Sequence, residues 1–209
     1  HLLNIYKDNQ YDNIFHEHVG FHSVKSIIDL CKLNKLKLFD VEKVDSQGGS
    51  IRCYICKVNS KKMISKKVEG ILKNEKKAKI FSGKILEKFK IKIKKHNSLM
   101  YNLIHKLKMK NYKISVYGAS GKGQALMQFL KIDNKLIDHV YDKSKLKQGR
   151  FTPGTNIKIK DPKYISIDNV DYLIILSWNI KDEIIKQERI FLREGGKFIV
   201  PFPKPKILN

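Results

Sequence analysis

The sequence predicts an α/β protein that ends in a mainly parallel sheet covered by helices. After Asn111 strand-like runs alternate with helical ones, a pattern typical of parallel α/β sheets. Residues 60–110 carry an apolar stripe at helical spacing, and residues 1–59 predict a helix followed by an antiparallel hairpin. We therefore expect three segments, 1–59, 60–110 and 111–209.

The first segment contains a helix and two strands. Ser23 stands where a helix N-cap belongs, directly before the periodic run Val24, Ile27, Ile28, Leu30 and Leu33. Two β-like runs follow, Leu36–Val44 and Ser50–Val58, and Asp45–Gly49 between them contains two adjacent glycines. A glycine turn between such runs predicts an antiparallel hairpin.

The middle segment predicts a long helical connector with Gly83 as a point of interruption. Its apolar stripe consists of Phe81, Ile85, Phe89, Ile93, Leu99, Leu103, Ile104 and Leu107. A helix packed by one stripe exposes most of its circumference, which gives the many lysines here a solvated face.

The third segment begins with the apolar run Tyr112–Tyr117, the loop Gly118–Gly123 and a helix that starts at Gln124. Further strands are predicted at Leu136–Tyr141, Tyr172–Leu176 and Lys197–Val200, with an amphipathic helix near Lys181–Leu192. Because ligands of open α/β sheets gather at the carboxyl ends of the strands, we expect Gly118–Gly123 and Trp178-Asn179 to share one edge.

Composition narrows the class of protein. The chain has 209 residues, of which 42% are hydrophobic and 30% charged, as in soluble globular proteins. No apolar run approaches the ~18 residues of a membrane span. The three cysteines, Cys31, Cys53 and Cys56, do not form a disulfide framework, which favours a reducing cytoplasm. The first residue is His1 rather than methionine, and we expect the sequence to be part of a longer protein.

The formal net charge of +23 raises the question of nucleic-acid binding. Between Lys57 and Lys113 there are 19 lysines and 3 acidic residues, whereas arginine occurs at four positions in the whole chain. Base readout and bidentate phosphate contacts favour arginine. We therefore favour a solvated helix face over a nucleic-acid interface, which stays the less favoured alternative.

The glycine loop of the third segment resembles a dinucleotide-binding turn only in part. Asp142 closes the second strand 24 residues after Gly118, where a ribose-binding acid would stand. However, Gly118, Gly121 and Gly123 are spaced GxxGxG rather than GxGxxG. A phosphate or other anion near Lys122 is therefore favoured over a nicotinamide cofactor, with a structural turn as the alternative.

The histidine-rich stretch predicts acid–base chemistry rather than a metal site. His16-Glu17-His18 is not HExxH, and the CxxC of Cys53 and Cys56 lies on a predicted strand, where its thiols point to opposite faces. We therefore predict no metal site. A glutamate beside a histidine suits proton transfer, because the imidazole titrates near neutrality. Taken alone, the stretch is by default interpreted as two surface histidines.

Seven motifs follow one another in the chain: Tyr11–His18, Gly48–Arg52, Tyr117–Gly123, Tyr141–Ser144, Lys147–Thr155, Trp178-Asn179 and Gly195–Pro201. Together they resemble a known family, the S-adenosylmethionine-dependent C-methyltransferases that act on nucleotide-linked deoxysugars. The resemblance implies that 1–59 closes a methyltransferase domain, that 60–110 is a connector, and that 111–209 is a Rossmann-like C-terminal domain. It also places the zinc-binding module and most of the S-adenosylmethionine site upstream of this sequence.

The resemblance implies roles for individual residues. In the family a base removes the proton beside a sugar ketone; this role falls on His18, supported by Glu17. Phe15 stands where the family has tyrosine, which leaves a catalytically inactive nucleotide-sugar-binding domain as the alternative. The residues implied near the nucleotide-sugar substrate are Gly118, Ser120, Lys122, Gly123, Lys147, Arg150, Thr152, Trp178 and Asn179.

Overall fold

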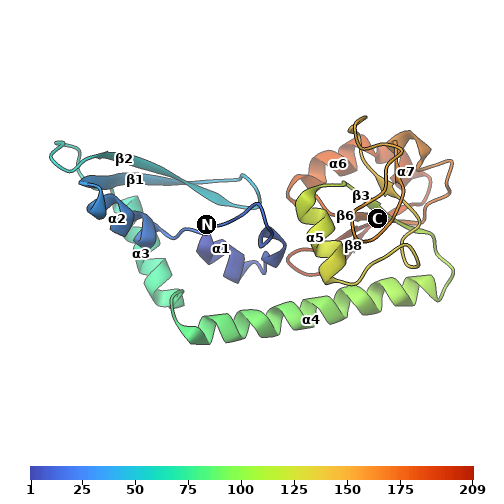
Figure 1. Cartoon of the computed structure of the whole chain (residues 1–209), viewed down its shortest axis with the longest axis horizontal. Coiled ribbons are helices and arrows are strands. Elements are labelled where there is room, and N and C mark those ends of the chain that lie inside the picture. Colours follow the sequence, from blue (N-terminus) through green and yellow to red (C-terminus); the bar gives the residue numbers. More distant parts are fainter. The chain divides into compact units, whose positions relative to one another are not determined.

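The computed structural model describes all residues from His1 to Asn209 and divides them into two compact units (Figure 1). The first comprises His1–Tyr11 and His16–Lys92, and the second comprises Asp12–Phe15 and Ile93–Asn209. These boundaries follow contacts, whereas 1–59, 60–110 and 111–209 follow sequence pattern, so that division stays a prediction. None of the helices combines the length and the apolar character that a membrane crossing requires.

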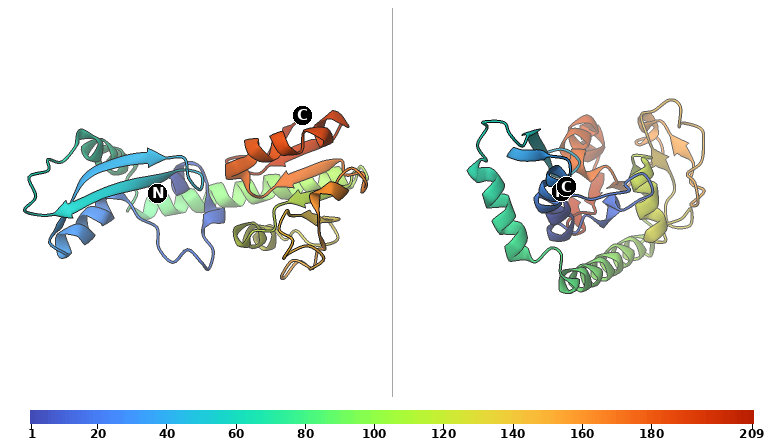
Figure 2. Two further views of the ribbon diagram at one scale, coloured as in Figure 1. Left: turned by 90° about the horizontal axis from the view of Figure 1, so that it is seen from above. Right: turned by 60° about the vertical axis from the view of Figure 1, so that its left-hand side comes forward.

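The first unit is built on the hairpin of β1 (Leu36–Val44) and β2 (Ser50–Lys57), which pair antiparallel as predicted (Figure 2). The turn between them holds Gly48 and Gly49 at positive φ, which glycine adopts without steric cost. The first unit also contains the helices α1 (Leu2–Lys7), α2 (Val24–Leu33) and α3 (Lys66–Ala78). A buried core of Val24, Cys31, Leu38, Val41, Val68 and Ile71 joins α2 and α3 to β1.

Helix α2 begins where the sequence predicts, and a buried carboxylate supports its first turn. The side chain of Ser23 accepts from the backbone N–H of Ser26, whose hydroxyl reciprocates in a capping box. Glu75 of α3, only 2% exposed, accepts from the N–H groups of Val24 (2.7 Å) and Lys25 (3.1 Å) and contacts Nε2 of His1 at 2.8 Å. Burial acts to raise the pKa of Glu75, but these hydrogen bonds outweigh it and the pKa is lowered.

The helical segment is interrupted before Gly83 rather than at it. Lys79 adopts a left-handed conformation that ends α3, and Gly83 is the first residue of α4 (Gly83–Lys108). The predicted stripe is therefore wrong in two places: Phe81 precedes α4 and is 65% exposed, and Leu99 is 44% exposed. The buried positions of α4 are Phe89, His96, Met100, Ile104 and Leu107.

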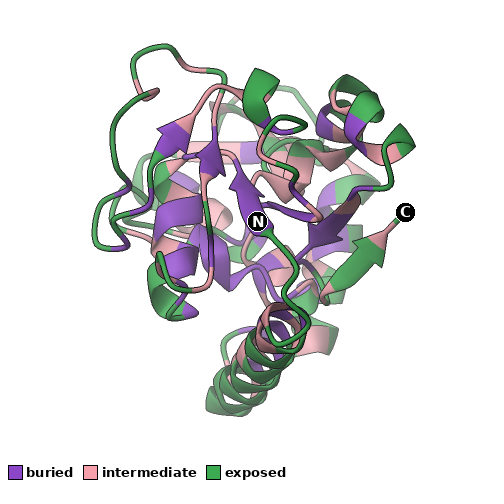
Figure 3. Cartoon of the chain, turned by 90° about the vertical axis from the view of Figure 1, so that its right-hand side faces the viewer, coloured by how far each residue is buried: buried purple, intermediate pink, exposed green.

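The second unit contains a six-stranded sheet in the order β5-β4-β3-β6-β7-β8. Five strands are parallel, which confirms the predicted fold class, and β8 pairs antiparallel with β7. The strands are β3 (Ile114–Tyr117), β4 (Val140–Tyr141), β5 (Ile159–Lys160), β6 (Tyr172–Ile175), β7 (Lys197–Val200) and β8 (Lys206–Leu208). Figure 3 shows the central strands of this sheet in the colour of buried residues.

The helices of the second unit are α5 (Gly121–Phe129), α6 (Lys181–Gln187) and α7 (Arg189–Arg193). The single helix predicted near Lys181–Leu192 is thus two helices, which meet at Glu188. The carboxylate of Glu188 accepts a 2.9 Å hydrogen bond from the hydroxyl of Tyr117. The strand predicted over Leu136–Tyr141 corresponds to β4 and is shorter than predicted, because only Val140 and Tyr141 pair with β3.

Two glycines provide a matched test of the packing. A side-chain Cβ at Gly196 would overlap the ring of Phe191, which is buried and packs edge-on against Phe198, whereas nothing lies within 4 Å of a Cβ at Gly70 in α3. Gly196→Ala is expected to destabilise the second unit by about 1–3 kcal/mol through overpacking. Gly70→Ala should stabilise the first unit by up to about 1 kcal/mol, since alanine is the better helix former. Urea unfolding measures both, and equal effects of the two substitutions would contradict the packing around Phe191.

Candidate functional site

The candidate site lies at the carboxyl edge of the sheet in the second unit, where the strand order reverses. β3 is the first strand of the sheet in the chain; β4 and β5 lie on one side of it and β6, β7 and β8 on the other. In open α/β sheets such a switch point is where ligands bind. The loops after β3 and β6 meet there, so Gly118–Gly123 and Trp178 share one edge as predicted.

Two glycines allow these loops to approach each other. Gly118 has φ +98°, and a Cβ there would lie 2.8 Å from the hydroxyl oxygen of Ser177. A Cβ at Gly123 would lie 2.9 Å from Cδ1 of Leu176. Ser120 between them caps α5 by accepting from the N–H of Gly123 at 3.1 Å. The sequence pattern of the loop is thus explained by close packing as well as by helix capping.

A buried carboxylate from the N-terminal part of the chain lies at this edge. Oδ2 of Asp12 accepts a 2.6 Å hydrogen bond from the indole Nε1 of Trp178 and lies 2.9 Å from the amine of Lys122. That amine also lies 4.8 Å from the centroid of the Trp178 ring. Asp12 is in the short 3₁₀ helix Tyr11–Asn13 and belongs to the second unit. The sequence pattern indicates no role for Asp12, although this residue lies within one of the seven motifs.

His96 of α4 is a second residue that the sequence did not indicate. Its Nε2 lies 2.6 Å from the carbonyl oxygen of Pro201, and its ring stacks on Phe202 at 4.8 Å. Phe202 in turn packs against Trp178 at 5.6 Å between ring centroids. Burial lowers the pKa of His96, while the Pro201 carbonyl and the charge of Asp12 oppose the shift. His96 therefore belongs to the cluster around Asp12.

Asp142, the acid directly after β4, forms its hydrogen bonds and ion pair with other residues of the second unit. Asp142 accepts from the N–H groups of Ala119 (2.7 Å) and Ser144 (2.8 Å), and the amine of Lys147 lies 3.3 Å from Oδ2. Both carboxylate oxygens therefore fix the loops after β3 and β4.

The Lys147–Thr155 motif packs near α5. The Thr152 hydroxyl is buried, lies 2.6 Å from that of Thr155 and accepts from the N–H of Ile157 at 2.9 Å. The side-chain amide of Gln128 in α5 donates to the carbonyl of Pro153 at 3.0 Å. Arg150 is exposed. The motif is a fixed loop in which the cations of Arg150 and, with a side chain 43% exposed, Lys147 are accessible to solvent.

The histidine stretch forms an exposed turn. His16, Glu17 and His18 are all exposed, and a carboxylate oxygen of Glu17 lies 3.9 Å from Nε2 of His16. The ring of His18 packs edge-on against Phe21 at 6.2 Å between centroids. Glu17 thus lies near His16, and its support of His18 stays a prediction. The half-buried Phe15 precedes the turn.

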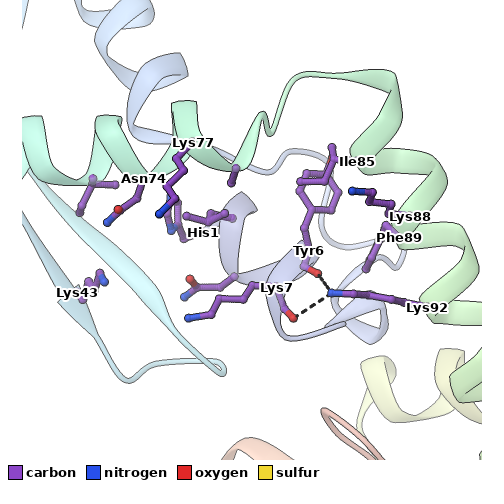
Figure 4. Close-up of a pocket in the computed structure, with 14 residues that line it drawn as sticks. His1, Tyr6, Lys7, Lys43, Asn74, Lys77, Ile85, Lys88, Phe89 and Lys92 are labelled. Atoms are coloured by element: carbon purple, nitrogen blue, oxygen red, sulfur yellow. Dashed lines mark hydrogen bonds between the residues drawn. The ribbon is translucent and has the colours of Figure 1, made fainter.

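A cavity of about 690 Å³ lies in the first unit, among residues of α1, β1, α3 and α4 (Figure 4). Its lysines are Lys7, Lys43, Lys77, Lys88 and Lys92. The amine of Lys92 donates to the carbonyls of Tyr6 (3.2 Å) and Lys7 (3.4 Å). The cavity contains none of the predicted site residues, so it is separate from the sheet edge described above.

Residues 45–203 match the family described as the C-methyltransferase C-terminal domain. The whole chain is 31% identical over 209 residues to C-methyltransferase NovU of Streptomyces niveus, and it spans about half (50%) of the length of that curated relative.

Two solved structures also show similarity. UDP-D-quinovosamine 4-dehydrogenase from Vibrio fischeri is 18% identical, with 43% of this chain and 76% of that chain covered and a TM-score of 0.32. RSP, a Rex-family repressor, is 14% identical, with 96% of this chain and 78% of that chain covered and a TM-score of 0.34. Similarity at these TM-scores carries no argument about function.

Proposed function

Because this chain belongs to the C-methyltransferase family, whose C-terminal domain it contains, we propose that it forms part of an enzyme that methylates a carbon of a nucleotide-linked keto-deoxysugar with S-adenosylmethionine. One observation carries the proposal. The match to C-methyltransferase NovU covers the whole chain, so it includes residues 1–44, which lie outside the family's C-terminal domain match and contain His16-Glu17-His18.

The chemistry assigned to His18 is removal of a proton. A hydrogen on the carbon beside a ketone is weakly acidic, so its removal requires a base whose pKa lies near the working pH. A histidine meets this requirement, and the exposed ring of His18 has access to a substrate in solution. The C–H bond breaks, the proton passes to the imidazole, and the electron pair moves into the enolate. Glu17 is proposed to stabilise the protonated imidazole.

The residues of this chain do not by themselves fit S-adenosylmethionine, which supplies the methyl group when bound. The first unit has a two-stranded hairpin with no glycine loop after a parallel strand. In the second unit the glycine loop packs on Ser177 and Leu176, and Lys122 beside it is paired with Asp12. The residues do not fit zinc either, because no three or more His, Cys, Asp or Glu side chains lie together in a group that could hold a metal ion.

We propose that the nucleotide sugar binds at the carboxyl edge of the second unit. The proposed contacts are the loop of Gly118, Ser120 and Gly123, the cations Lys122, Lys147 and Arg150, and the side chains of Thr152, Trp178 and Asn179. Two observations support these contacts. The loop Gly118–Gly123 and Trp178 lie at the same edge of the sheet, and Asp142 contacts both the N–H of Ala119 in that loop and the amine of Lys147. Anionic phosphates suit a helix start flanked by cations.

The proposal is tested with the active enzyme, S-adenosylmethionine and a nucleotide-linked keto-deoxysugar. Mass spectrometry should show that the sugar has gained one methyl group, and NMR should place it on the carbon next to the ketone. The matched sugar with a hydroxyl in place of the ketone should give no product, because its C–H is no longer acidic. Methyl transfer to an oxygen, or equal transfer to both sugars, would contradict the proposal.

The lysine-rich helices are expected to make no contribution to substrate affinity. Lys66, Lys73, Lys84 and Lys95 are exposed. Changing all four to glutamine should leave the affinity for the nucleotide sugar within about twofold, because exposed charges are screened over a Debye length of ~8 Å. Isothermal calorimetry measures this affinity, and a tenfold loss would assign the lysines to the binding site.

A further inference from the structure

The segment that leads to the histidine turn is buried although it is polar. Residues 9–13 are consecutive and buried, and four of them carry polar side chains: Asn9, Gln10, Asp12 and Asn13. The next residues change abruptly, since Ile14 is 53% exposed and residues 16–20 are all exposed. Buried polar groups are costly unless they are paired. The burial of this segment therefore needs partners that compensate it.

Asp12 has such partners. Its side chain is fully buried, and one oxygen, Oδ2, contacts both the indole N–H of Trp178 (2.6 Å) and the amine of Lys122 (2.9 Å). The side chain of Lys122 is 11% exposed, and its amine also lies over the Trp178 ring. Removal of one partner from a buried ion pair leaves the other as an uncompensated charge. The three side chains therefore depend on one another.

The position of this cluster in the sheet is informative. Lys122 is in the first turn of α5, directly after β3, and Trp178 follows β6, so both stand at the switch point where ligands of open α/β sheets bind. The anion that lies beside Lys122 at the switch point is the carboxylate of Asp12, a residue of the same chain. It belongs to a segment that ends at the histidine turn, since Asp12 lies four residues before His16.

We infer that Asp12, Lys122 and Trp178 form an anchor that fixes residues 12–15 at the carboxyl edge of the second unit, and so fixes the point of the chain from which the turn with His18 starts. This inference rests on the proposed function, in which His18 is the base. Asp12 acts through the backbone that it holds and is a positioning residue. A base displaced by about 1 Å can lose as much as 10²-fold in rate, which is why the segment before it would need to be fixed.

The contact itself can be measured without catalysis. Trp178 is the one tryptophan of the chain, so a ¹⁵N-labelled protein gives a single indole N–H signal. Asp12→Ala is expected to shift this signal and to speed exchange of its proton with deuterated water by at least about tenfold, because the hydrogen bond that protects it is gone. Asp12→Asn keeps an oxygen that can accept from the indole, and should keep most of the protection.

The matched control is Asp168→Ala. Asp168 also forms a part-buried ion pair in the second unit, 2.8 Å from the amine of Lys160, and accepts from the hydroxyl of Tyr141 at 2.7 Å. Its loss should lower stability in the same way as the loss of Asp12 but leave the indole signal unchanged. Protection of the indole that survives Asp12→Ala would overturn the anchor.

Catalysis provides the second readout, as exchange of the substrate's α-proton with deuterated water. In Asp12→Ala the maximal exchange rate, measured at saturating substrate, should fall by about 10–100-fold. Asp12→Asn should recover part of this rate, and Asp168→Ala should keep the parent rate.

The two proposals fail in different ways. A loss of exchange in His18→Ala together with an unchanged maximal rate in Asp12→Ala would overturn the positioning role and leave the proposed function intact. Unchanged exchange in His18→Ala would overturn the proposed base, whereas the indole signal would still decide whether Asp12 anchors its segment.

Discussion

His18→Ala is expected to lower turnover of the active enzyme by about 10²–10⁴-fold, the usual contribution of a general base. The affinity for the nucleotide sugar should change far less, because the imidazole is proposed to act on one C–H bond rather than to hold the nucleotide. The direct assay is exchange of the sugar's α-proton with deuterated water in the absence of a methyl donor. This assay isolates proton removal from methyl transfer.

His16→Ala is the matched control, because His16 lies in the same exposed turn and is the residue that pairs with Glu17. It should cost much less turnover than His18→Ala. If His18→Ala exchanges the proton as fast as the parent enzyme does, His18 is not the base. If His16→Ala has the larger effect, the base is the histidine on the other side of Glu17.

Glu75→Ala is expected to destabilise the first unit by about 2–4 kcal/mol, because it leaves the N–H groups of Val24 and Lys25 without their acceptor. Val24 is fully buried, so water cannot readily replace the lost hydrogen bond. Chemical denaturation followed by circular dichroism measures the free energy of unfolding. Glu69→Ala in the exposed first turn of the same helix should cost less than about 1 kcal/mol.

The stabilisation by Glu75 should also depend on pH. Its pKa is lowered in the folded protein, so its contribution is complete above the unfolded value of about 4.3 and is lost as the pH falls through the folded value. The difference in stability between the parent protein and Glu75→Gln should therefore shrink below about pH 4. A difference that stays constant from neutral to acidic pH would show that the charge of Glu75 contributes nothing.

The elements that sequence predicted well are those specified by local signals. Ser23 caps its helix through residues within one turn, and Gly48-Gly49 allow the positive φ of the hairpin turn. The strands β5 and β8 were not predicted, because runs of two and three residues are too short to show a period. Their pairing depends on neighbouring strands, β4 and β7, rather than on their own side chains.

The residues of the candidate site, too, were predicted where a local sequence pattern marks them and missed where none does. The loop after β3 has its own glycine pattern, and its position next to Trp178 follows from the topology of parallel strands. Asp12 carries no such pattern, since its partners lie 110 and 166 residues further along the chain. His96 was not predicted to be buried, because the predicted apolar stripe of α4 contained Leu99 instead of the neighbouring Met100. Met100 is buried on the same helix as His96, whereas Leu99 is exposed.

The place of Asp12 in the chain has a consequence for protein engineering. The family match covers residues 45–203, and a fragment cut at those limits would retain Lys122 and Trp178 but discard the carboxylate that contacts both. Such a fragment would lack both partners' contact with the carboxylate, the 2.9 Å ion pair of Lys122 and the 2.6 Å hydrogen bond of Trp178. During synthesis on the ribosome, Asp12 emerges long before Lys122 and Trp178, so this contact can form only after Trp178 has been made. The limits of the family match therefore exclude residues 12–15, which belong to the second unit, and a C-terminal fragment would keep their contacts only with these residues restored, either by circular permutation or as an added peptide.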